Sequence, residues 1–300
     1  MSGVFRAVRA AACGLASTLL LAGAAQALQV TDQRGVTVSF EKTPQRIVSL
    51  LPSLTESVCA LEQCQRLVGV DRYSNFPESV RRLPQLGGGI DPSIEAVVAL
   101  KPDVVLMAVS SRASSRFESL GLKVVALEPK NHADVRRVLG TLGVLLDVPP
   151  SAPGRLWREI DAGVSAAAQS LPPAAHKLRV YFEVSRGPYG AGEASFIGET
   201  LTRLGVKNVI PAELGPFPRL NPEYVVRADP DLIMIGNRSM QARVPYPGWD
   251  RIKAVREQRV CVYGIEDSDV VVRPGPRMAE AARIMARCVN DKLALPGTAR

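Results

Sequence analysis

Residues 95–106 read EAVVALKPDVVL, and residues 223–234 read EYVVRADPDLIM. Both segments begin with a glutamate, continue with a Val-Val pair and reach a Pro-Asp at the same offsets. In each segment the residues before the proline favour a short helix, and the apolar run after Pro-Asp is typical of a buried parallel strand. The repeat therefore predicts two similar halves of the chain, each with its glutamate in the first turn of a helix.

Strand-like and helix-like segments alternate throughout both halves, which predicts two Rossmann-like α/β lobes with parallel sheets. In the first half we expect strands at 46–51, 67–71, 104–109 and 123–127. Helices should follow from Ser53 or Thr55 (with Glu56 in the first turn), from Asp91 as N-cap with Pro92 next, and at 112–120 and 132–146. In the second half we expect strands at 178–184, 231–236 and 259–264, and helices at 195–205, 221–228 (capped by Asn221), 248–255 and 276–292.

The segment between the halves, SAPGRLWREIDAGVSAAAQSLPP (151–173), has the pattern of one amphipathic helix. Leu156, Ile160 and Val164 recur at i+4, and Ser151 is a candidate cap. About 20 helical residues would span ~30 Å, so the connection should be a rigid α-helix and not a flexible linker. We expect an N-terminal lobe at 28–148, the connecting helix at 149–173, a C-terminal lobe at 174–295 and a short tail at 296–300.

The N-terminus has the features of an export signal. Arg6 and Arg9 precede an apolar run at 10–24, and Ala25-Gln26-Ala27 matches a signal-peptidase site. The run is short for a membrane anchor, which is the alternative. Most of the run follows Cys13 instead of leading up to it, which is unlike the arrangement around a lipoprotein cysteine. We predict a cleaved signal peptide at 1–27 and a periplasmic mature protein.

An even number of cysteines remains after residue 27, which in an exported chain suggests disulfides. We pair Cys59 with Cys64, across the end of a helix, and Cys261 with Cys288. The alternative is four buried thiols. Zinc is disfavoured, because neither of the two histidines lies near a cysteine in the sequence.

The composition and motifs disfavour nucleic-acid binding and catalysis. The net charge of +8 is spread thinly, without a Lys/Arg run. His132 and His176 have no nucleophile elbow nearby, and the sequence contains neither a phosphate-binding loop with its lysine nor a zinc-protease motif. We therefore expect no enzyme activity, no resident metal and no cofactor.

A ligand of an open α/β sheet binds beyond the carboxyl ends of the strands. The loops expected there mix tyrosines, hydroxyls and arginines, a lining that suits a large, partly polar organic ligand. They comprise Pro52-Ser53-Leu54, Arg72-Tyr73-Ser74-Asn75, Ser110-Ser111-Arg112, Ser185-Arg186-Gly187-Pro188-Tyr189 and Glu266-Asp267-Ser268-Asp269.

At RIVSLLPSLTE (46–56), RLVGVDRYSNFPE (66–78) and EAVVALKPDVVL (95–106) the chain resembles periplasmic solute-binding proteins of metal-chelate ABC importers. It is most similar to the cobalamin-binding members, over nearly all of residues 30–292. The resemblance implies two lobes bridged by one long helix, a ligand held between them and a monomer in solution. It also implies that Glu95 and Glu223, one per lobe, dock onto arginines of a dimeric permease.

The resemblance further implies a set of ligand-binding residues. The family's tyrosine matches Tyr73, and its segment before the last helix matches 269–273. Cobalamin-binding relatives carry tryptophan where this chain has Gly89, Ala108 and Phe217, and phenylalanine where it has Tyr189. Together with the strand-end loops, these matches predict ligand contacts by Tyr73, Gly89, Ser110, Arg186, Tyr189, Phe217, Asp269, Val270, Val271, Val272 and Arg273.

Cobalamin or a related corrinoid is the ligand we expect, and ferric siderophores or haem are the alternatives. Phe76 occupies the region where a haem-binding relative would use tyrosine. Anionic chelates could meet Arg112, Arg186, Arg238 and Arg273. An extracytoplasmic α/β transferase is an alternative of another class, for which Asp269 and Glu193 would be the candidate carboxylates.

Overall fold

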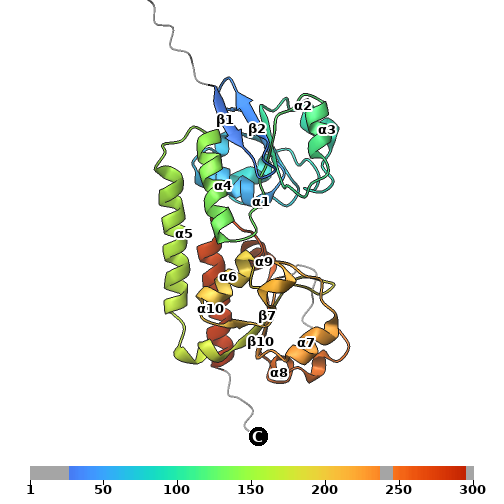
Figure 1. The fold of residues 1–300 in the computed structure, drawn as a ribbon, viewed down its shortest axis with the longest axis vertical. Coiled ribbons are helices and arrows are strands. Elements are labelled where there is room, and N and C mark those ends of the chain that lie inside the picture. Colours follow the sequence, from blue (N-terminus) through green and yellow to red (C-terminus); the bar gives the residue numbers. More distant parts are fainter. Residues whose placement is uncertain (1–26, 237–245, 295–300) are drawn as a thin grey trace, which may run out of the picture.

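The computed structural model describes residues 27–236 and 246–294, which form two α/β lobes stacked one above the other (Figure 1). The long helix α5 (Ala152–Gln169) runs along one side of both lobes. The predicted signal peptide apart from Ala27, the predicted tail and Arg238 lie outside the described residues. Within those residues, no helix combines the length and apolar character that a membrane-spanning segment requires.

The first lobe contains the predicted parallel sheet, with strand order β4-β3-β5-β6. The strands are β3 (Ile47–Ser49), β4 (Leu67–Val70), β5 (Val104–Met107) and β6 (Val124–Ala126). The helices are α1 (Pro52–Ala60), α2 (Ile94–Ala99), α3 (Ser114–Ser119) and α4 (His132–Leu145), with 3-10 turns at Cys64–Arg66 and Glu78–Arg82. An antiparallel hairpin that we did not predict, β1 (Leu28–Thr31) and β2 (Thr37–Phe40), precedes the sheet.

The second lobe repeats this architecture around the sheet β11-β10-β7-β8, with β9 also paired to β7. All strand pairs are parallel except β7–β8, an antiparallel hairpin that we did not predict. The strands are β7 (Arg179–Ser185), β8 (Tyr189–Gly190), β9 (Lys207–Asn208), β10 (Leu232–Ile235) and β11 (Val260–Val262). The helices are α6 (Phe196–Arg203), α7 (Pro222–Ala228), α8 (Lys253–Arg256), α9 (Ile265–Val271) and α10 (Met278–Leu293), with 3-10 turns at Pro173–Lys177, Ala212–Leu214 and Trp249–Arg251.

The repeated Pro-Asp strands lie at the centre of each lobe. Every residue of β5 and of β10 is buried, because helices cover both faces of each sheet. The surrounding cores are mostly aliphatic, which agrees with an aromatic content of only 5%. The two-lobe parallel α/β fold predicted from the repeat is confirmed.

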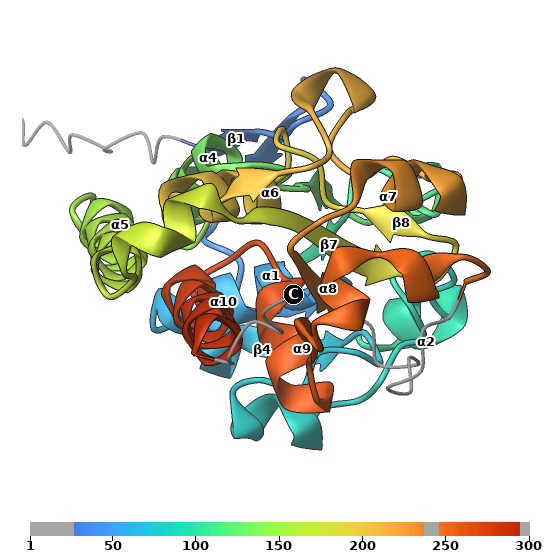
Figure 2. The same cartoon turned by 90° about the horizontal axis from the view of Figure 1, so that it is seen from below.

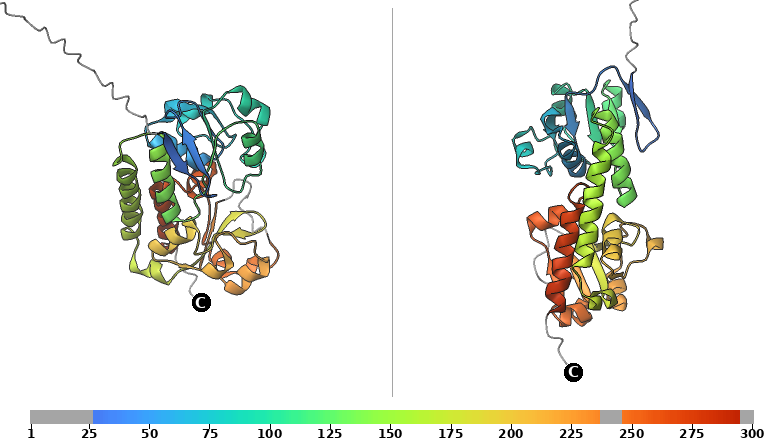
Figure 3. Two further views of the ribbon diagram at one scale, coloured as in Figure 1. Left: turned by 45° about the horizontal axis from the view of Figure 1, so that its top comes forward. Right: turned by 90° about the vertical axis from the view of Figure 1, so that its left-hand side faces the viewer.

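Helix α5 holds the lobes together because it packs on a helix from each of them. It lies against α4 of the first lobe and α10 of the second (Figure 3). Ile160 joins Leu139 and Met278 in one buried cluster, so three helices share a core. An added Cβ at Gly163 would lie 2.5 Å from the Cβ of Ala279, which shows how closely α5 and α10 approach.

Two helix starts and one helix length differ from our predictions. The first helix begins at Pro52 without a side-chain cap, because Ser53 and Thr55 already lie inside it. The cap of α2 is Ser93 and not Asp91, whose carboxylate instead pairs with Arg72 at 2.9 Å. The expected helix at 248–255 divides into the 3-10 turn and α8. The predicted cap of α7 is confirmed, since Asn221 accepts a hydrogen bond from the Glu223 amide.

Both predicted disulfides are present. Cys59 is bonded to Cys64 at the end of α1, and Cys261 in β11 is bonded to Cys288 in α10. The second bond connects the edge strand of the sheet to the helix that packs on α5. It therefore ties the C-terminal helix to its own lobe.

Candidate functional site

Two adjoining hollows lie between the lobes, at the carboxyl ends of the strands. Their volumes are about 420 Å³ and 300 Å³. Leu51 and Ser53 of the first lobe and Val272 and Pro274 of the second line both hollows. The larger hollow is also lined by Glu128, Pro129, Lys130, Phe196, Leu214, Pro216, Phe217 and Pro218, and the smaller by Pro52, Tyr73, Asp269 and Arg273. We name the two hollows together the interlobe cleft.

Large apolar side chains from both lobes are accessible around the interlobe cleft. Tyr73 is 50% exposed, and Tyr189 and Leu214 are also exposed. Phe217 packs on Phe196, with ring centroids 5.9 Å apart. Because exposed apolar groups concentrated at a concave site favour a ligand with apolar faces, the cleft suits a large organic molecule.

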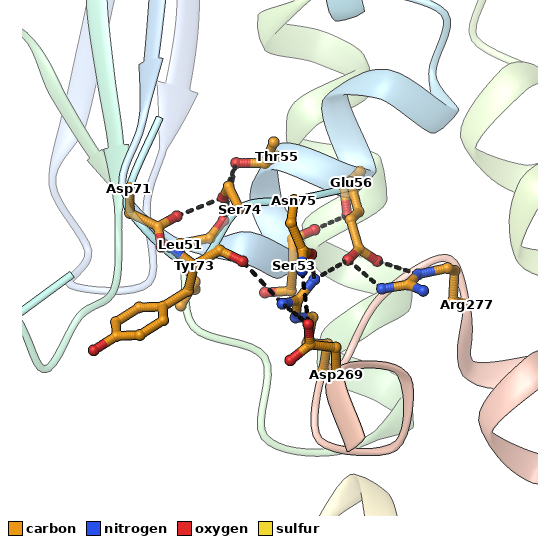
Figure 4. Close-up of polar contacts among 12 residues, drawn as sticks. Leu51, Ser53, Thr55, Glu56, Asp71, Tyr73, Ser74, Asn75, Asp269 and Arg277 are labelled. Atoms are coloured by element: carbon orange, nitrogen blue, oxygen red, sulfur yellow. Dashed lines mark hydrogen bonds and ion pairs between the residues drawn. The ribbon is translucent and has the colours of Figure 1, made fainter. Parts of the chain in front are cut away.

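A buried turn positions Tyr73. The carboxylate of Asp71 accepts a hydrogen bond from the Tyr73 amide at 2.8 Å and another from the Ser74 hydroxyl. Burial raises the pKa of Asp71, although these hydrogen bonds favour the charged form. With its backbone fixed in this way, the Tyr73 ring projects away from the turn (Figure 4), and the Arg72 guanidinium lies 5.8 Å from the ring centroid.

Arg273 and Asp269, which we predicted to contact ligand, belong to a polar network that joins the lobes (Figure 4). The Arg273 guanidinium donates to Glu56 at 2.9 Å, to the Asn75 side chain at 2.8 Å and to the Tyr73 carbonyl at 2.9 Å. Asp269 pairs with Arg273 at 3.0 Å and accepts from Asn75 at 2.8 Å. We call this group, with Arg277, the interlobe network.

Glu56 is the centre of the interlobe network, and sequence reasoning missed its role. Its buried carboxylate accepts from Arg277 at 2.7 and 3.0 Å in addition to Arg273. Burial disfavours the charged form of Arg277, but the hydrogen bonds to Glu56 outweigh this and raise its pKa. The guanidinium of Arg277 also lies 4.2 Å from the ring centroid of Phe76. A single glutamate within the apolar stretch LTESVCAL was the sequence signal that could have indicated a buried ion pair.

The lobes make a second polar contact, at residues that line the larger hollow. The Phe196 amide donates to the Lys130 carbonyl at 2.7 Å, and the His132 amide donates to Glu199 at 2.6 Å. The His132 ring lies 3.0 Å from the Thr200 hydroxyl, and burial lowers its pKa. Polar contacts between the lobes therefore involve residues that line each of the two hollows.

Two of the valines that we predicted as ligand contacts are core residues. Val270 and Val271 are buried in the second lobe because 265–271 folds as helix α9, whose inner face they occupy. Their side chains are directed into the core, which corrects the prediction for these two positions. Val272 does line the interlobe cleft.

Gly89 has a packing role. An added Cβ would lie 2.7 Å from the Leu50 carbonyl oxygen, and the Gly89 carbonyl accepts from Ser111 at 2.9 Å. The next residue, Ile90, is 84% exposed and was missed by the sequence analysis. Three glycines followed by an isoleucine were the available signal, since a tight loop presents the next side chain outward.

The polar groups of Ser110 are hydrogen-bonded within the protein. Its amide and hydroxyl donate to Glu128 at 2.8 and 2.9 Å, and Glu128 itself lines the interlobe cleft. Arg186 and Tyr189 are exposed on the turn between β7 and β8. The backbone of Tyr189 forms an antiparallel β-bridge with Arg219, which is two residues beyond Phe217. This turn therefore adjoins the wall of the larger hollow.

Glu95 and Glu223 occupy equivalent positions on the two lobes. Each is exposed in the first turn of its helix, α2 or α7. Figures 1 and 2 place both helices on the side of the molecule opposite α5. In the described residues, no group of histidine, cysteine, aspartate and glutamate side chains is arranged to hold a metal ion.

Proteins of known class resemble this chain over most of its length. An ABC transporter substrate-binding lipoprotein of Bacillus subtilis is 27% identical over 87% of this chain and 84% of its own length. A vitamin B12-binding protein of Pectobacterium atrosepticum is 26% identical over 86% of this chain and 92% of its own length.

Solved structures share the fold. A possible iron-binding periplasmic solute-binding protein of Staphylococcus epidermidis superposes with a TM-score of 0.70 and 25% identity, over 83% of this chain and 99% of its own. The periplasmic haem-binding protein BhuT in complex with two haems gives a TM-score of 0.69 at 25% identity, over 83% of this chain and 99% of its own. The family of periplasmic binding proteins matches residues 47–265, and the chain belongs to this family.

Proposed function

We propose that this protein is the periplasmic substrate-binding component of an ABC importer, and that it captures cobalamin or a related corrinoid between its lobes. The observation that carries the proposal is the interlobe cleft, which has apolar and aromatic walls from both lobes and a polar base. A corrin ring with amide side chains has matching apolar faces and polar edges. The named relatives that bind vitamin B12 support this choice of ligand.

Binding would then depend on shape and a few hydrogen bonds and not on catalysis. Tyr73 and Val272 would contact one part of the ligand, and Phe217 and Tyr189 another. The interlobe network limits how far the lobes can separate, so ligand entry requires only a small rocking motion. We propose no enzyme activity for this site.

Calorimetric titration of the exported chain with cyanocobalamin tests the ligand. Phe217→Ala should weaken binding at least tenfold, because it removes one wall of the larger hollow. Val144→Ala is the matched control, since Val144 is exposed on α4 away from the interlobe cleft. Absence of heat and of thermal stabilisation at tens of micromolar ligand would exclude cobalamin.

Haem or a ferric chelate is the second candidate ligand. The exposed Tyr73 favours it, since a phenolate can ligate ferric iron, and haem-binding proteins are among the structures with the same fold. Haemin titration followed by its absorption spectrum decides between the candidates. A charge-transfer band from phenolate to ferric iron that is lost in Tyr73→Phe would establish haem in place of cobalamin.

Delivery would use Glu95 and Glu223 as the contacts with two equivalent subunits of a permease. Their equivalent positions and their exposure support this role. Replacing both with arginine should abolish uptake and leave ligand affinity unchanged. Glu62→Arg with Glu159→Arg makes the same charge change on the α5 side and should leave uptake intact. Normal uptake by the Glu95/Glu223 variant would contradict the docking role.

A further inference from the structure

A buried carboxyl group lies beneath the turn that joins β7 to β8. Glu183, near the end of β7, is 0% exposed. Its two carboxylate oxygens accept hydrogen bonds from different tyrosines, Tyr246 at 3.0 Å and Tyr181 at 3.2 Å. A carboxyl group enclosed in this way needs both partners, because burial removes the water that would otherwise solvate it.

Tyr246 connects this carboxyl group to the backbone of the turn. Its hydroxyl oxygen accepts a hydrogen bond from the Gly187 amide at 2.9 Å while its proton is donated to Glu183. Gly187 has φ 155°, and an added Cβ would lie 2.7 Å from the Tyr189 ring. A chain of hydrogen bonds therefore runs from a buried charge to the residue on which the Tyr189 ring rests.

Opposing effects act on the ionisation of Glu183. Burial raises the pKa of Glu183 to about 7, although the hydrogen bonds from Tyr246 and Tyr181 and the Arg186 guanidinium favour the ionised form. Those three are the titratable groups that face the carboxyl group within the described residues. The ionised form accepts stronger hydrogen bonds than the protonated form, so it holds Tyr246 more firmly.

We propose that Glu183 is a positioning residue that fixes the turn 185–189 at the interlobe cleft through Tyr246, and that the turn is held more firmly when Glu183 is ionised. The consequence for ligand affinity rests on the proposed function, because Arg186 and Tyr189 are ligand contacts only under that proposal. The mechanical role of Glu183 in the turn does not depend on the ligand.

Trp249 is a natural fluorescent reporter of the hydrogen bonds around Glu183. The Trp249 ring lies 4.6 Å from the Tyr246 ring and 5.7 Å from the Tyr181 ring, centroid to centroid. The other tryptophan, Trp157, lies on α5. A Trp157→Phe protein therefore has one tryptophan, placed beside both tyrosines that bond Glu183.

The first test uses this single-tryptophan protein without ligand. Its fluorescence from about pH 5 to about pH 9 should show one transition near neutrality, which Glu183→Gln abolishes. Tyr246→Phe keeps the ring but removes a hydrogen bond to the ionised form, so the transition should move to higher pH. Glu193→Gln, an exposed glutamate nearby in the chain, is the control and should leave the transition unchanged.

Hydrogen exchange of the Gly187 amide provides a second readout. At constant pH, exchange should be about tenfold faster in Tyr246→Phe. In the parent protein the protection factor of this amide, which is the intrinsic exchange rate divided by the observed rate, should rise as Glu183 ionises. A transition that persists in Glu183→Gln, or an unchanged exchange rate in Tyr246→Phe, would overturn the proposal.

Ligand titration then tests the consequence for binding. The Kd of cyanocobalamin should fall by about threefold to tenfold as pH rises through neutrality, and the Glu183→Gln profile should be flat. If cyanocobalamin does not bind at all, the proposed ligand fails, while the ligand-free experiments still decide the role of Glu183. A parent profile with no pH dependence would overturn the link between the turn and binding.

Discussion

Replacing Glu56 with glutamine should weaken both the fold and the connection between its lobes. The Glu56 side chain is 2% exposed, and it is hydrogen-bonded to two arginines from the second lobe, Arg273 and Arg277. Glutamine keeps the shape of the side chain and removes its charge. Both guanidinium groups are largely buried, so each would lose a counter-ion that water cannot replace.

The magnitude follows from this burial. Removing one partner from a buried ion pair typically destabilises a protein by 3–5 kcal/mol, and the lower figure, about 3 kcal/mol, applies because Asp269 still pairs with Arg273. That is a large part of the ~5–15 kcal/mol that stabilises a typical domain.

Urea unfolding followed by tryptophan fluorescence measures this loss, because Trp157 reports on α5 and Trp249 on the second lobe. The midpoint for Glu56→Gln should fall by about 1 M. Glu159→Gln, at an exposed position on α5, is the control and should unfold like the parent. A midpoint for Glu56→Gln equal to that of Glu159→Gln would refute the interpretation of the interlobe network as an electrostatic connection.

Three further changes test other parts of the structure. Replacing Cys261 and Cys288 with serine should lower the free energy of unfolding by about 3–4 kcal/mol, measured by urea unfolding, because a 27-residue separation is no longer cross-linked. Gly89→Ala should lower the melting temperature by several degrees, since its Cβ would meet the Leu50 carbonyl, and an unchanged value would show that the loop adapts freely. Because the folded-state pKa of Glu183 is raised, the folded state retains a proton that the unfolded state loses as the pH rises. The free energy of unfolding should therefore fall by on the order of 3 kcal/mol between about pH 4.5 and pH 7. Urea unfolding at a series of pH values measures this slope, which Glu183→Gln should remove.

The fold was predictable because its signals are local and repeated. Apolar runs such as VVLM in β5 form buried parallel strands wherever helices flank them, and the i+4 pattern of Ile160 and Val164 identifies the buried face of α5. Short elements were less predictable. The β7–β8 hairpin has few residues, and its formation depends on a hydrogen bond between Gly190 and the distant Pro218.

The candidate site was predictable only in part. Because parallel strands end at one edge of a sheet, the loop after β4 was expected at the ligand site, and Tyr73 of that loop lines the interlobe cleft. Phe217, which also lines the cleft, was predicted from the family resemblance. The resemblance also assigned Val270 and Val271 to the cleft, but both belong to the core, because 265–271 folds as helix α9. Ile90 was missed because exposure depends on neighbours that sequence spacing does not identify.

By itself, the sequence determined two α/β lobes, the rigid helix between them, both disulfides and the equivalent positions of Glu95 and Glu223. Only the tertiary structure decided that Arg273 is paired with Glu56, 217 residues away, and that Glu183 lies against Tyr246. The physical reason is that local patterns fix secondary structure, whereas the charge, burial and accessibility of a side chain depend on groups that are distant in the chain. Those long-range contacts decide which polar residues hold the lobes together and which remain available to a ligand.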